Sequence, residues 1–460
     1  MADKNVTLAD TVAALAQQKK YAALRDILVT MNPADIAAMF DELEEHTLPL
    51  LFRLLPKDIA ADTFIEMDAD SQELLIRGFS DSELKEVVDE LYVDDTVDLV
   101  EEMPANVVNR ILKQADAETR KLINDILKYP EDSAGSIMTT EFVDLRPAMS
   151  VSDAIKHIRR AGVDSETINT CYVVDDGRHL VGIASIRSII LAEEDAKLSD
   201  IMEENVISVD TMTDQEDVAA MFTKYNFTAL PVVDGEKRLV GIVTVDDAME
   251  VLESEATEDI ELMGGTTPID RPYLKTSAWR LWLARIPWLL VLMIGATFTG
   301  IILKRYEDIL SSPALLTLVI FIPMLMDTGG NSGSQSSVTV LRGLSLEDIT
   351  SSDFFSVVWK EIRVAVLCGV SLAVVAFGKV MLVDHLLMHN NEVTTSVALA
   401  ICVTMVLVVV VAKLIGCILP MLADKLKLDP AVLSAPAITT IVDALSLLIY
   451  FTVAMKMLAL

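Results

Sequence analysis

An aspartate in the middle of an apolar segment is the residue of this chain whose type and position most strongly indicate chemistry. Asp443 lies within Ala431–Met455, where the other polar groups are small hydroxyl side chains. A carboxylate at membrane depth costs about 3 kcal/mol on insertion scales, and such a residue usually faces a bundle interior or a water-filled route for ions or protons. The alternative is a structural aspartate that caps or hydrogen-bonds a neighbouring helix.

Two prolines interrupt the beginning of this segment. Pro430 and Pro436 cannot donate helical hydrogen bonds, and Ala435–Thr440 is mostly small or hydroxyl-bearing. Irregular backbone survives at membrane depth only where it is buried in protein or lines a cavity. We therefore expect a helix that opens here to line a path.

A second apolar segment, at about 313–341, contains a stretch rich in glycine, amide and hydroxyl groups, Asp327–Ser337. Such a stretch does not suit contact with lipid. It either packs closely against another helix, because small residues let backbones approach, or lines a wet path with polar oxygens. A re-entrant or terminal loop without contact to any path is the remaining alternative. The candidate lining residues are Gly329, Gly330, Asn331, Gly333 and Gln335.

Charge divides the chain into two parts. Residues 1–270 carry 57 Asp and Glu against 23 Lys and Arg, a net charge of −34, whereas residues 271–460 carry 12 against 14, a net charge of +2. An acidic surface repels nucleic acid and anionic lipid, so nucleic acid is excluded as a partner. It attracts cations, and hard divalent cations prefer oxygen ligands. The other interpretation is a solvated surface that only confers solubility.

Residues 1–130 are expected to form a cytoplasmic helical domain. Four similar segments, which begin near Asn32, Leu55, Ser80 and Asp94, start with an N-cap residue or a proline and continue with apolar residues at helical spacing. Repeated short helices predict a superhelical stack. The N-terminal MADKNVTLAD has no apolar signal region, which favours a cytoplasmic location for this part.

Two copies of a β-rich unit follow. Tyr172–Ser185 and Pro231–Thr244 align without gaps, and each contains a V-V-D strand, a polar turn and L-V-G-I. Helices are expected at Val151–Ala161 and Asp214–Tyr225. This tandem α/β repeat resembles a pair of cystathionine-β-synthase (CBS) domains, which we place at 131–200 and 201–247.

CBS pairs in general are regulatory modules that often bind adenine nucleotides. The second copy resembles the ribose and phosphate motif of that family at Gly241, Thr244 and Asp247, whereas the first copy has Ser188 at the acidic position. The resemblance therefore implies ATP or another adenine nucleotide at one site at most.

An acidic helix within 248–270 is expected to connect the CBS pair to the remainder of the chain and to end at Gly264-Gly265. Residues 271–460 are expected to form a transmembrane domain of five helices, because each of five apolar segments is long enough to cross a bilayer. These segments are about 281–303, 313–341, 363–383, 394–420 and 431–456.

The expected fold is thus a multidomain membrane protein with a helical superhelical N-domain, an α/β tandem CBS pair, an acidic connecting helix and a five-span α-helical transmembrane domain. Lys and Arg mark the cytoplasmic side of membrane proteins. Their distribution here predicts cytoplasmic N-terminal domains, an outside C-terminus and a position in the plasma (inner) membrane.

The whole chain resembles the MgtE-type magnesium transporters, which are Mg²⁺-gated channels. The resemblance rests on PEDSAGSIMTTEF at 130–142, TVDDAMEVLESEATEDI at 244–260, GGNSGSQSS at 329–337 and DPAVLSAPAITTIVDALSLLIYF at 429–451. It implies a homodimer whose pore is lined by the second and fifth spans of both subunits, with Asp443 as the ion-recognition residue. One departure is Ala444-Leu445-Ser446, where many relatives have a glycine soon after the aspartate.

Within that resemblance, the chemistry of Mg²⁺ suggests how the ion is held. Mg²⁺ loses its water reluctantly, so a selective site should hold the hydrated ion with hydrogen-bond acceptors. Two Asp443 carboxylates across a dimer axis would suit, with the carbonyls of Ala437 and Ile438 and the hydroxyls of Thr439 and Thr440. Because no G-x-x-x-x-G-K-[ST] motif occurs, no obligate ATPase partner is predicted, and the membrane potential is expected to drive transport.

The acidic half then acquires a regulatory role. Facing carboxylates repel one another when bare, and Mg²⁺ between them converts the repulsion into a bridge. We expect cytoplasmic Mg²⁺ to dock the N-domain, CBS pair and connecting helix together and so to close the pore. The expected ligands are Asp94, Asp95, Asp98, Glu216, Asp246, Asp247, Glu250, Glu255, Glu258 and Asp259.

Three other functions are weighed against this one. Transport of Co²⁺, Ni²⁺ or Mn²⁺ is the first, although the expected path lacks conspicuous Cys or His ligands. A membrane-anchored nucleotide sensor is the second, and Asp443 argues against a passive anchor. An enzyme is not expected, because no convincing nucleophile–base arrangement appears. His385 and His389 have a spacing that suits a transition metal, but an incidental pair is the simpler interpretation.

Overall fold

The computed structural model describes residues 7–163, 165–269, 271–306, 317–346, 348–390, 392–432 and 435–458. The chain divides into two compact units, Met1–Leu252 and Glu253–Leu460, and each is described here by itself.

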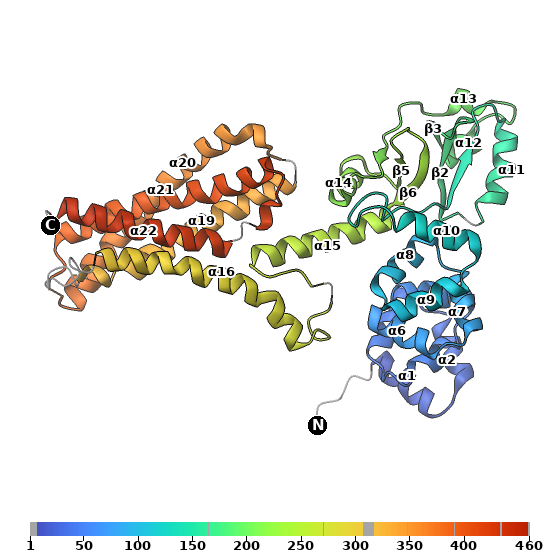
Figure 1. Ribbon diagram of the computed structural model, residues 1–460, viewed down its shortest axis with the longest axis horizontal. Helices are drawn as coiled ribbons and strands as arrows, with labels where there is room; N and C mark the ends of the chain where they lie inside the picture. The colour runs from blue at the N-terminus through green and yellow to red at the C-terminus, as the bar shows by residue number, and fades with distance from the viewer. Residues whose placement is uncertain are drawn as a thin grey trace. The chain divides into compact units, whose positions relative to one another are not determined.

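Unit 1 begins with a stack of short helices, drawn in blue and cyan in Figure 1. Local sequence explains their ends: Asn32 caps a helix that has Pro33 at its first position, and Ser80 forms a reciprocal capping box with Glu83. The predicted helical domain is therefore confirmed. Its helices are α1 (Leu8–Gln17), α2 (Tyr21–Leu28), α3 (Pro33–Asp41), α4 (Leu48–Phe52), α5 (Lys57–Ile65), α6 (Ala69–Gly78), α7 (Asp81–Val88), α8 (Val93–Glu102), α9 (Ala105–Gln114) and α10 (Ala117–Ile126).

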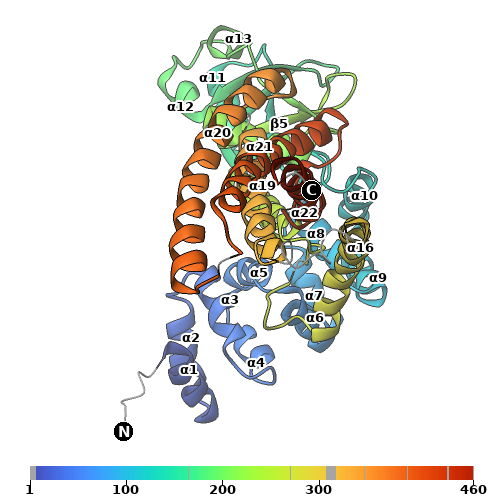
Figure 2. The ribbon, with the colours of Figure 1, turned by 90° about the vertical axis from the view of Figure 1, so that its left-hand side faces the viewer.

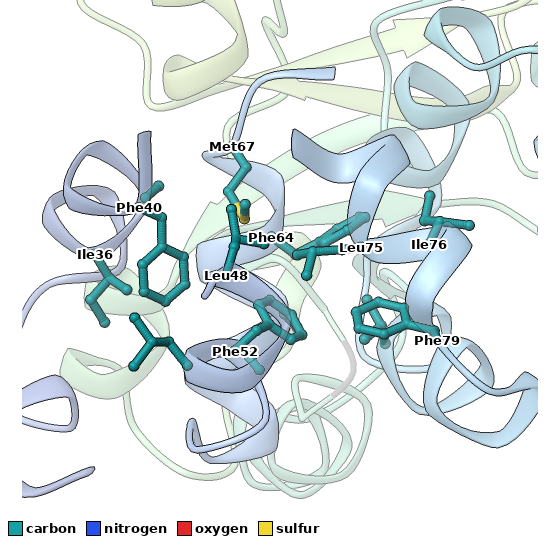
Figure 3. Packing of buried hydrophobic residues seen from close by; sticks show 14 of the residues in the cluster. Ile36, Phe40, Leu48, Phe52, Phe64, Met67, Leu75, Ile76 and Phe79 are labelled. Atoms are coloured by element: carbon teal, nitrogen blue, oxygen red, sulfur yellow. The ribbon is translucent and has the colours of Figure 1, made fainter. Parts of the chain in front are cut away.

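One continuous apolar core holds these helices together. Phe52 lies at its centre, with ring centroids 6.2 Å from Phe64 and 5.4 Å from Phe79. Figure 3 shows these rings coming together from separate parts of the stack, with Phe40 and Leu75 nearby. Burial of such large side chains contributes about 1.5–3 kcal/mol each, so the stack positions α8 and its acidic residues firmly.

The tandem repeat predicted from the sequence is confirmed as two three-stranded sheets of the same topology. In each sheet the first two strands pair in parallel and the last two pair antiparallel. Tyr172 pairs with Ile183, and Pro231 pairs with Ile242 at the equivalent positions. The elements are β1 (Phe142–Leu145), α11 (Val151–Ala161), β2 (Thr167–Val174), β3 (Leu180–Ser185), α12 (Ile186–Leu191), α13 (Leu198–Ile201), β4 (Val209–Asp210), α14 (Gln215–Tyr225), β5 (Ala229–Val233) and β6 (Leu239–Thr244).

The acidic helix α15 (Val245–Met263) follows β6 directly, beginning in unit 1 and ending in unit 2. Its predicted end is confirmed, because Gly265 adopts the left-handed conformation with a φ of 69°. The backbone N–H of Gly264 donates to the Ile260 carbonyl at 3.0 Å, which closes the last turn.

Unit 2 is a bundle of long helices. In Figure 2, α16 and α20 lie on opposite sides of α19, α21 and α22, and the contacts agree: α20 packs on α21, α16 packs on α22, and α19 packs on both α21 and α22. The elements are α16 (Ala278–Arg305), α19 (Ile322–Ser345), η1 (Ser351–Asp353), α20 (Phe354–Lys379), the π-helix η2 (Val380–Leu387), α21 (Thr395–Lys425), η3 (Pro430–Val432) and α22 (Ala435–Met457).

Among the described residues, four helical segments are long and apolar enough to cross a membrane: Ala278–Arg305, Ser351–Leu387, Thr395–Lys425 and Ala435–Met457. The glycine- and serine-rich α19 is not among them, and the predicted span 313–341 begins in residues outside the described ranges. The membrane character of this unit thus agrees with the sequence. The span predicted at 313–341, which would bring the number to five, stays a prediction.

Candidate ion path and regulatory carboxylates

Asp443 lies half-buried in the middle of α22, a regular helix that begins at Ala435. The expected opening of this helix is therefore wrong for residues 435–440. Pro436 is the second residue of α22, where a missing N–H leaves no intrahelical hydrogen bond unmade. The helix consequently keeps the carbonyls of Ala437 and Ile438 within its own hydrogen-bond ladder.

The hydroxyls expected to assist Asp443 are also used within α22. Thr439 donates to the Ala435 carbonyl at 2.9 Å, and Thr440 donates to the Pro436 carbonyl at 3.0 Å. Each hydroxyl oxygen still has free lone pairs, so both side chains can accept from an ion's water. The side chain of Asp443 has no hydrogen-bond or ion-pair partner in the described part of the chain.

The three candidate glycines of α19 serve helix packing. A β-carbon at Gly330 would stand 2.8 Å from Thr439 Cγ2, and one at Gly333 would stand 3.0 Å from Ile438 Cγ2. At Gly329 it would stand 2.8 Å from Val408 of α21 and 2.9 Å from the Ser446 hydroxyl. All three glycines are buried. This differs from the pore-lining expectation and matches the alternative in which small residues let helices approach closely.

Asn331 and Gln335, the other two candidates on α19, are exposed on the surface of the single chain. They lie four residues apart and therefore on one face of the helix. Between them, Ser334 places its hydroxyl 3.5 Å from the Thr439 hydroxyl of α22. The structure therefore brings a polar edge of α19 beside the helix that carries Asp443.

A second group of carboxylates lies in unit 1, where α8 meets both CBS repeats. Oxygens of Asp94, Glu166 and Asp247 lie within 4.8 Å of one another. Asp94 is only 7% exposed, and its Oδ1 has no hydrogen-bond partner, as is also true of Glu166 Oε2. Buried polar oxygens without a partner are rare in folded proteins. A hard divalent cation, which prefers carboxylate oxygens, fits this set.

The pKa values of these acids show the cost of placing them together. Burial, followed by the charges of Asp95, Glu166 and Asp247, raises the pKa of Asp94 to about 9. Burial and Asp247 raise the pKa of Glu166 to about 7 and the pKa of Asp95 to about 7. Burial also raises the pKa of Asp247, against the opposing effect of its hydrogen bond from Thr244. A bound cation would relieve this repulsion.

Glu166 was not among the residues predicted from the sequence. It lies immediately before β2, and its backbone N–H donates to the Glu141 carbonyl at 3.0 Å. Glu141 in turn accepts from the N–H of Val93 at 3.0 Å, which ties the beginning of α8 to the first CBS repeat. Only this tertiary contact distinguishes Glu166 from the many other acids of unit 1.

The other predicted ligands of unit 1 lie outside this group of three oxygens, although burial and the charge of Asp247 also raise the pKa of Asp98 to about 7. Most of them are exposed: Asp98, Glu216, Asp246 and Glu250. Glu216 lies in the first turn of α14, where an acidic side chain also complements the helix dipole.

Of the predicted ligands in unit 2, Asp259 lies beside Ser345. Its Oδ2 accepts from the Ser345 hydroxyl at 3.4 Å, and burial, followed by the charge of Asp429, raises its pKa. Asp259 of α15 and Asp429, just before η3, are therefore close enough to repel. Glu255 is half-buried and Glu258 is exposed.

The predicted nucleotide residues lie together at the end of β6. The Thr244 hydroxyl donates to Asp247 Oδ2 at 2.6 Å. A β-carbon at Gly241 would stand 2.6 Å from Met138 Sδ, so the glycine admits the close approach of Met138. Asp247 thus belongs to both the nucleotide motif and the buried carboxylate group.

Comparison with known proteins identifies the family to which the chain is similar. The model of the MgtE divalent cation transporter matches residues 322–453, that of the MgtE intracellular N domain matches 31–132, and that of the CBS domain matches 134–195 and 198–254. A solved structure, the cytosolic domain of the Mg²⁺ channel MgtE in complex with ATP, is 38% identical with a TM-score of 0.51. It covers 53% of this chain and 100% of that one.

Two curated relatives align with almost the whole chain. The magnesium transporter MgtE of Thermus thermophilus is 37% identical over 97% of this chain and 98% of its own length. The magnesium transporter MgtE of Bacillus subtilis is 32% identical over 96% of this chain and 95% of its own length. With this identity over nearly the full length, together with the matches in all three parts, the chain belongs to the MgtE family.

Proposed function

We propose that this protein takes up Mg²⁺ across the plasma membrane along a path lined by α19 and α22, with Asp443 as the residue that recognises the ion. The observation that carries the proposal is the unpartnered carboxylate of Asp443, half-buried in an otherwise apolar helix and beside the polar edge of α19. Likeness to full-length proteins named magnesium transporters supports the choice of ion.

Oxygen chemistry and charge account for the transport step in this proposal. Asp443 and the Thr439 and Thr440 hydroxyls accept hydrogen bonds from the water shell that Mg²⁺ keeps. An inward-negative potential of 100 mV supplies about 4.6 kcal/mol for a doubly charged ion. No other source of energy is required, provided that the soluble domains face the cytoplasm.

A second copy of the chain completes the path. Asn331 and Gln335 are exposed on a helix within the apolar bundle, a position that lipid would not suit. In a homodimer these amides and the two Asp443 side chains would face each other across a shared axis. The spacing of the copies would then set the width of the path.

Cytoplasmic Mg²⁺ would regulate the path through the soluble acids. Asp94, Glu166 and Asp247 repel when bare and would be bridged by one cation, which fixes α8 to both CBS repeats. A second bridge, between Asp259 of α15 and Asp429 before α22, would hold α15 in the closed state. An adenine nucleotide at Thr244 and Asp247 would use an acid of the first site, so the two ligands would influence each other.

Flux into sealed vesicles that contain the purified protein tests this proposal. Wild type is compared with Asp443→Asn and with the matched control Asp348→Asn, which removes an exposed acid outside the helices of the same unit. We expect Mg²⁺ uptake that is lost in Asp443→Asn, kept in the control and suppressed by Mg²⁺ on the soluble-domain side.

Other outcomes separate the competing functions. Equal flux in Asp443→Asn would remove this residue from the path. Uptake of Co²⁺, Ni²⁺ or Mn²⁺ in preference to Mg²⁺ would change the assignment of the transported ion. A folded wild type without any flux would favour a nucleotide sensor.

A further inference from the structure

A second carboxylate on the path-facing side of the bundle has no role in the function proposed so far. Asp327 is the only acidic residue within α19, and its side chain is exposed on the surface of the single chain. A charged group on an intramembrane helix that faced lipid would cost about 3 kcal/mol or more, so such residues face protein or water. Asp327 forms no hydrogen bond or ion pair with any residue that the structure describes.

The packing of α19 against α22 fixes the level at which Asp327 lies. Gly333 contacts Ile438, Gly330 contacts Thr439, and Gly329 contacts Val442 and Ser446. Residue numbers fall on α19 as they rise on α22, so the two helices run antiparallel. Asp327 lies one turn from Gly330, and Asp443 lies one turn from Thr439 in the same direction. The two acids are therefore at the same depth.

Both acids also lie on the same side of this helix pair. Asp327 and Ser334 are seven residues apart and share a face of α19, while Thr439 and Asp443 are four apart and share a face of α22. The hydroxyls of Ser334 and Thr439 approach to 3.5 Å across the seam between the helices. The two carboxylates therefore flank the same seam.

Two further observations indicate that this part of the seam is polar. Asn331 and Gln335 continue the exposed polar edge of α19 at intervals of four residues from Asp327. Ser446, on the next turn of α22 after Asp443, is only 2% exposed, yet its hydroxyl has no hydrogen-bond partner in the described residues. Buried hydroxyl groups usually have a hydrogen-bond partner, so the Ser446 hydroxyl is free to bind a water molecule or a ligand.

From this geometry we propose that Asp327 is a second ion-path acid, which acts with Asp443 on the hydrated divalent cation and sets the preference for divalent over monovalent ions. This inference rests on the proposed transport function. A divalent ion interacts with each carboxylate twice as strongly as a monovalent ion does at equal distance. A second acid at the same depth therefore favours Mg²⁺ more than Na⁺ or K⁺, and the bare repulsion between the two acids is relieved when the cation enters.

Transport by full-length protein in vesicles tests the proposal through affinity and selectivity. Asp327→Asn should raise the Mg²⁺ concentration for half-maximal flux by about tenfold, the effect of losing one charged hydrogen-bond partner. It should also increase Na⁺ or K⁺ leak in the absence of Mg²⁺. Asp327→Glu keeps the charge and should retain selectivity, and Asp348→Asn is the control for charge removal outside the path.

The outcomes distinguish this inference from the proposed function. If Asp327→Asn behaves like wild type while Asp443→Asn abolishes flux, Asp327 is not on the path and the function stands. If Asp443→Asn leaves flux unchanged, transport stands but Asp443 is not on the path, and the inference that Asp327 acts with it fails. If folded wild type shows no flux, the proposed function itself fails. Should Asp327→Asn not yield folded protein, Asp327→Ser removes the same charge and decides. Weaker Mg²⁺ affinity with a larger Na⁺ or K⁺ leak in folded Asp327→Ser supports the proposal, and wild-type affinity and selectivity in that variant overturn it.

Discussion

The indole ring of Trp288 occupies the space beside Gly265 in which a β-carbon would have to stand. Gly265 ends the acidic helix α15, and Trp288 belongs to α16. The same β-carbon would also lie 3.4 Å from Pro436, at the beginning of the helix that carries Asp443. The end of the acidic helix is thus in contact with the start of the candidate ion-recognition helix.

Gly265→Ala should therefore loosen the end of α15 and weaken closure by cytoplasmic Mg²⁺. The substitution meets both a positive φ of 69° and the indole ring, which together cost about 1–3 kcal/mol. We expect flux to persist at Mg²⁺ concentrations that close the wild type. Vesicle flux measured against Mg²⁺ on the soluble-domain side, with hydrogen exchange at α15, checks this.

Gly264→Ala is the matched control, because Gly264 has no positive φ and its β-carbon would stand no nearer than 3.2 Å to the Glu261 carbonyl. If Gly265→Ala closes at the same Mg²⁺ concentration as wild type, the contact of Gly265 with Trp288 and Pro436 does not couple α15 to closure of the path.

Asp94→Asn should have opposite effects on stability without and with Mg²⁺. Without a cation, Asp94 must bind a proton on folding at neutral pH, because burial and its acidic neighbours raise its pKa to about 9. Asparagine removes this cost, so the bare protein should become more stable. The same change removes a ligand, so the increase in Tm produced by Mg²⁺ should shrink, and Glu166→Gln should act in the same way. Thermal unfolding of the full-length protein in detergent, with and without Mg²⁺, measures both effects.

If Asp94 had only a structural role, Asp94→Asn would lower the Tm both without and with Mg²⁺, because a stabilising hydrogen bond would be lost in both cases. Asp195→Asn, which removes an exposed acid of the first CBS repeat, should change neither value.

Features that depend on local sequence could be predicted, whereas features that depend on contacts between distant segments could not. The two CBS repeats were found because Tyr172–Ser185 and Pro231–Thr244 repeat a local alternation of apolar residues, and both form the same strand pair. The acidic helix was found because glycine at a helix end is also a local signal. Glu166 was missed because its partnership with Asp94 depends on a contact between distant segments.

The prolines near α22 were misinterpreted for a related reason. Pro436 breaks a helix when it lies in the interior but is well suited to the first turn. The sequence alone does not say which turn it occupies, and the structure begins α22 at Ala435. Similarly, the glycines of α19 suit either a path or close packing, and only the positions of Thr439 and Ile438 show the packing.

The stability of unit 1 without divalent cations should decrease as the pH rises from about 5 to about 9. Burial and neighbouring acids raise the pKa of Asp94 to about 9, and raise that of Asp95 and of Glu166 to about 7. In this window the folded state therefore binds protons that the unfolded state has released, so the free energy of unfolding falls as the pH rises. Unfolding in the presence of a chelator, at several pH values, measures the slope.

Mg²⁺ should flatten this slope, because a bound cation displaces the same protons. Its affinity should rise by up to about tenfold per pH unit for each proton displaced. Asp94→Asn should show a smaller slope than wild type; an unchanged slope would mean that other groups govern the pH dependence.

A buried lysine in α21 leads to the last prediction, which concerns the support of the candidate path. Lys413 is only 5% exposed and has no hydrogen bond or ion pair among the residues described. Cys417 lies one turn further along α21, and its surroundings include Glu361 of α20 as well as Lys413. Glu361 accepts a hydrogen bond from the Ser336 hydroxyl of α19 at 2.5 Å. Glu361, which is bound to α19, and Lys413 of α21 are therefore both close to Cys417.

If Lys413 offsets the charge of Glu361, Lys413→Met should destabilise the bundle, because it leaves the Glu361 carboxylate without that opposite charge. Lys413→Met combined with Glu361→Gln should recover part of the loss, with a coupling of about 0.5–3 kcal/mol between the two positions. The Tm of the purified bundle in detergent and the rate of Mg²⁺ flux should recover together, because both depend on how α19 is held. Additive effects of the two substitutions would show that Lys413 and Glu361 act independently and that Ser336 alone anchors Glu361.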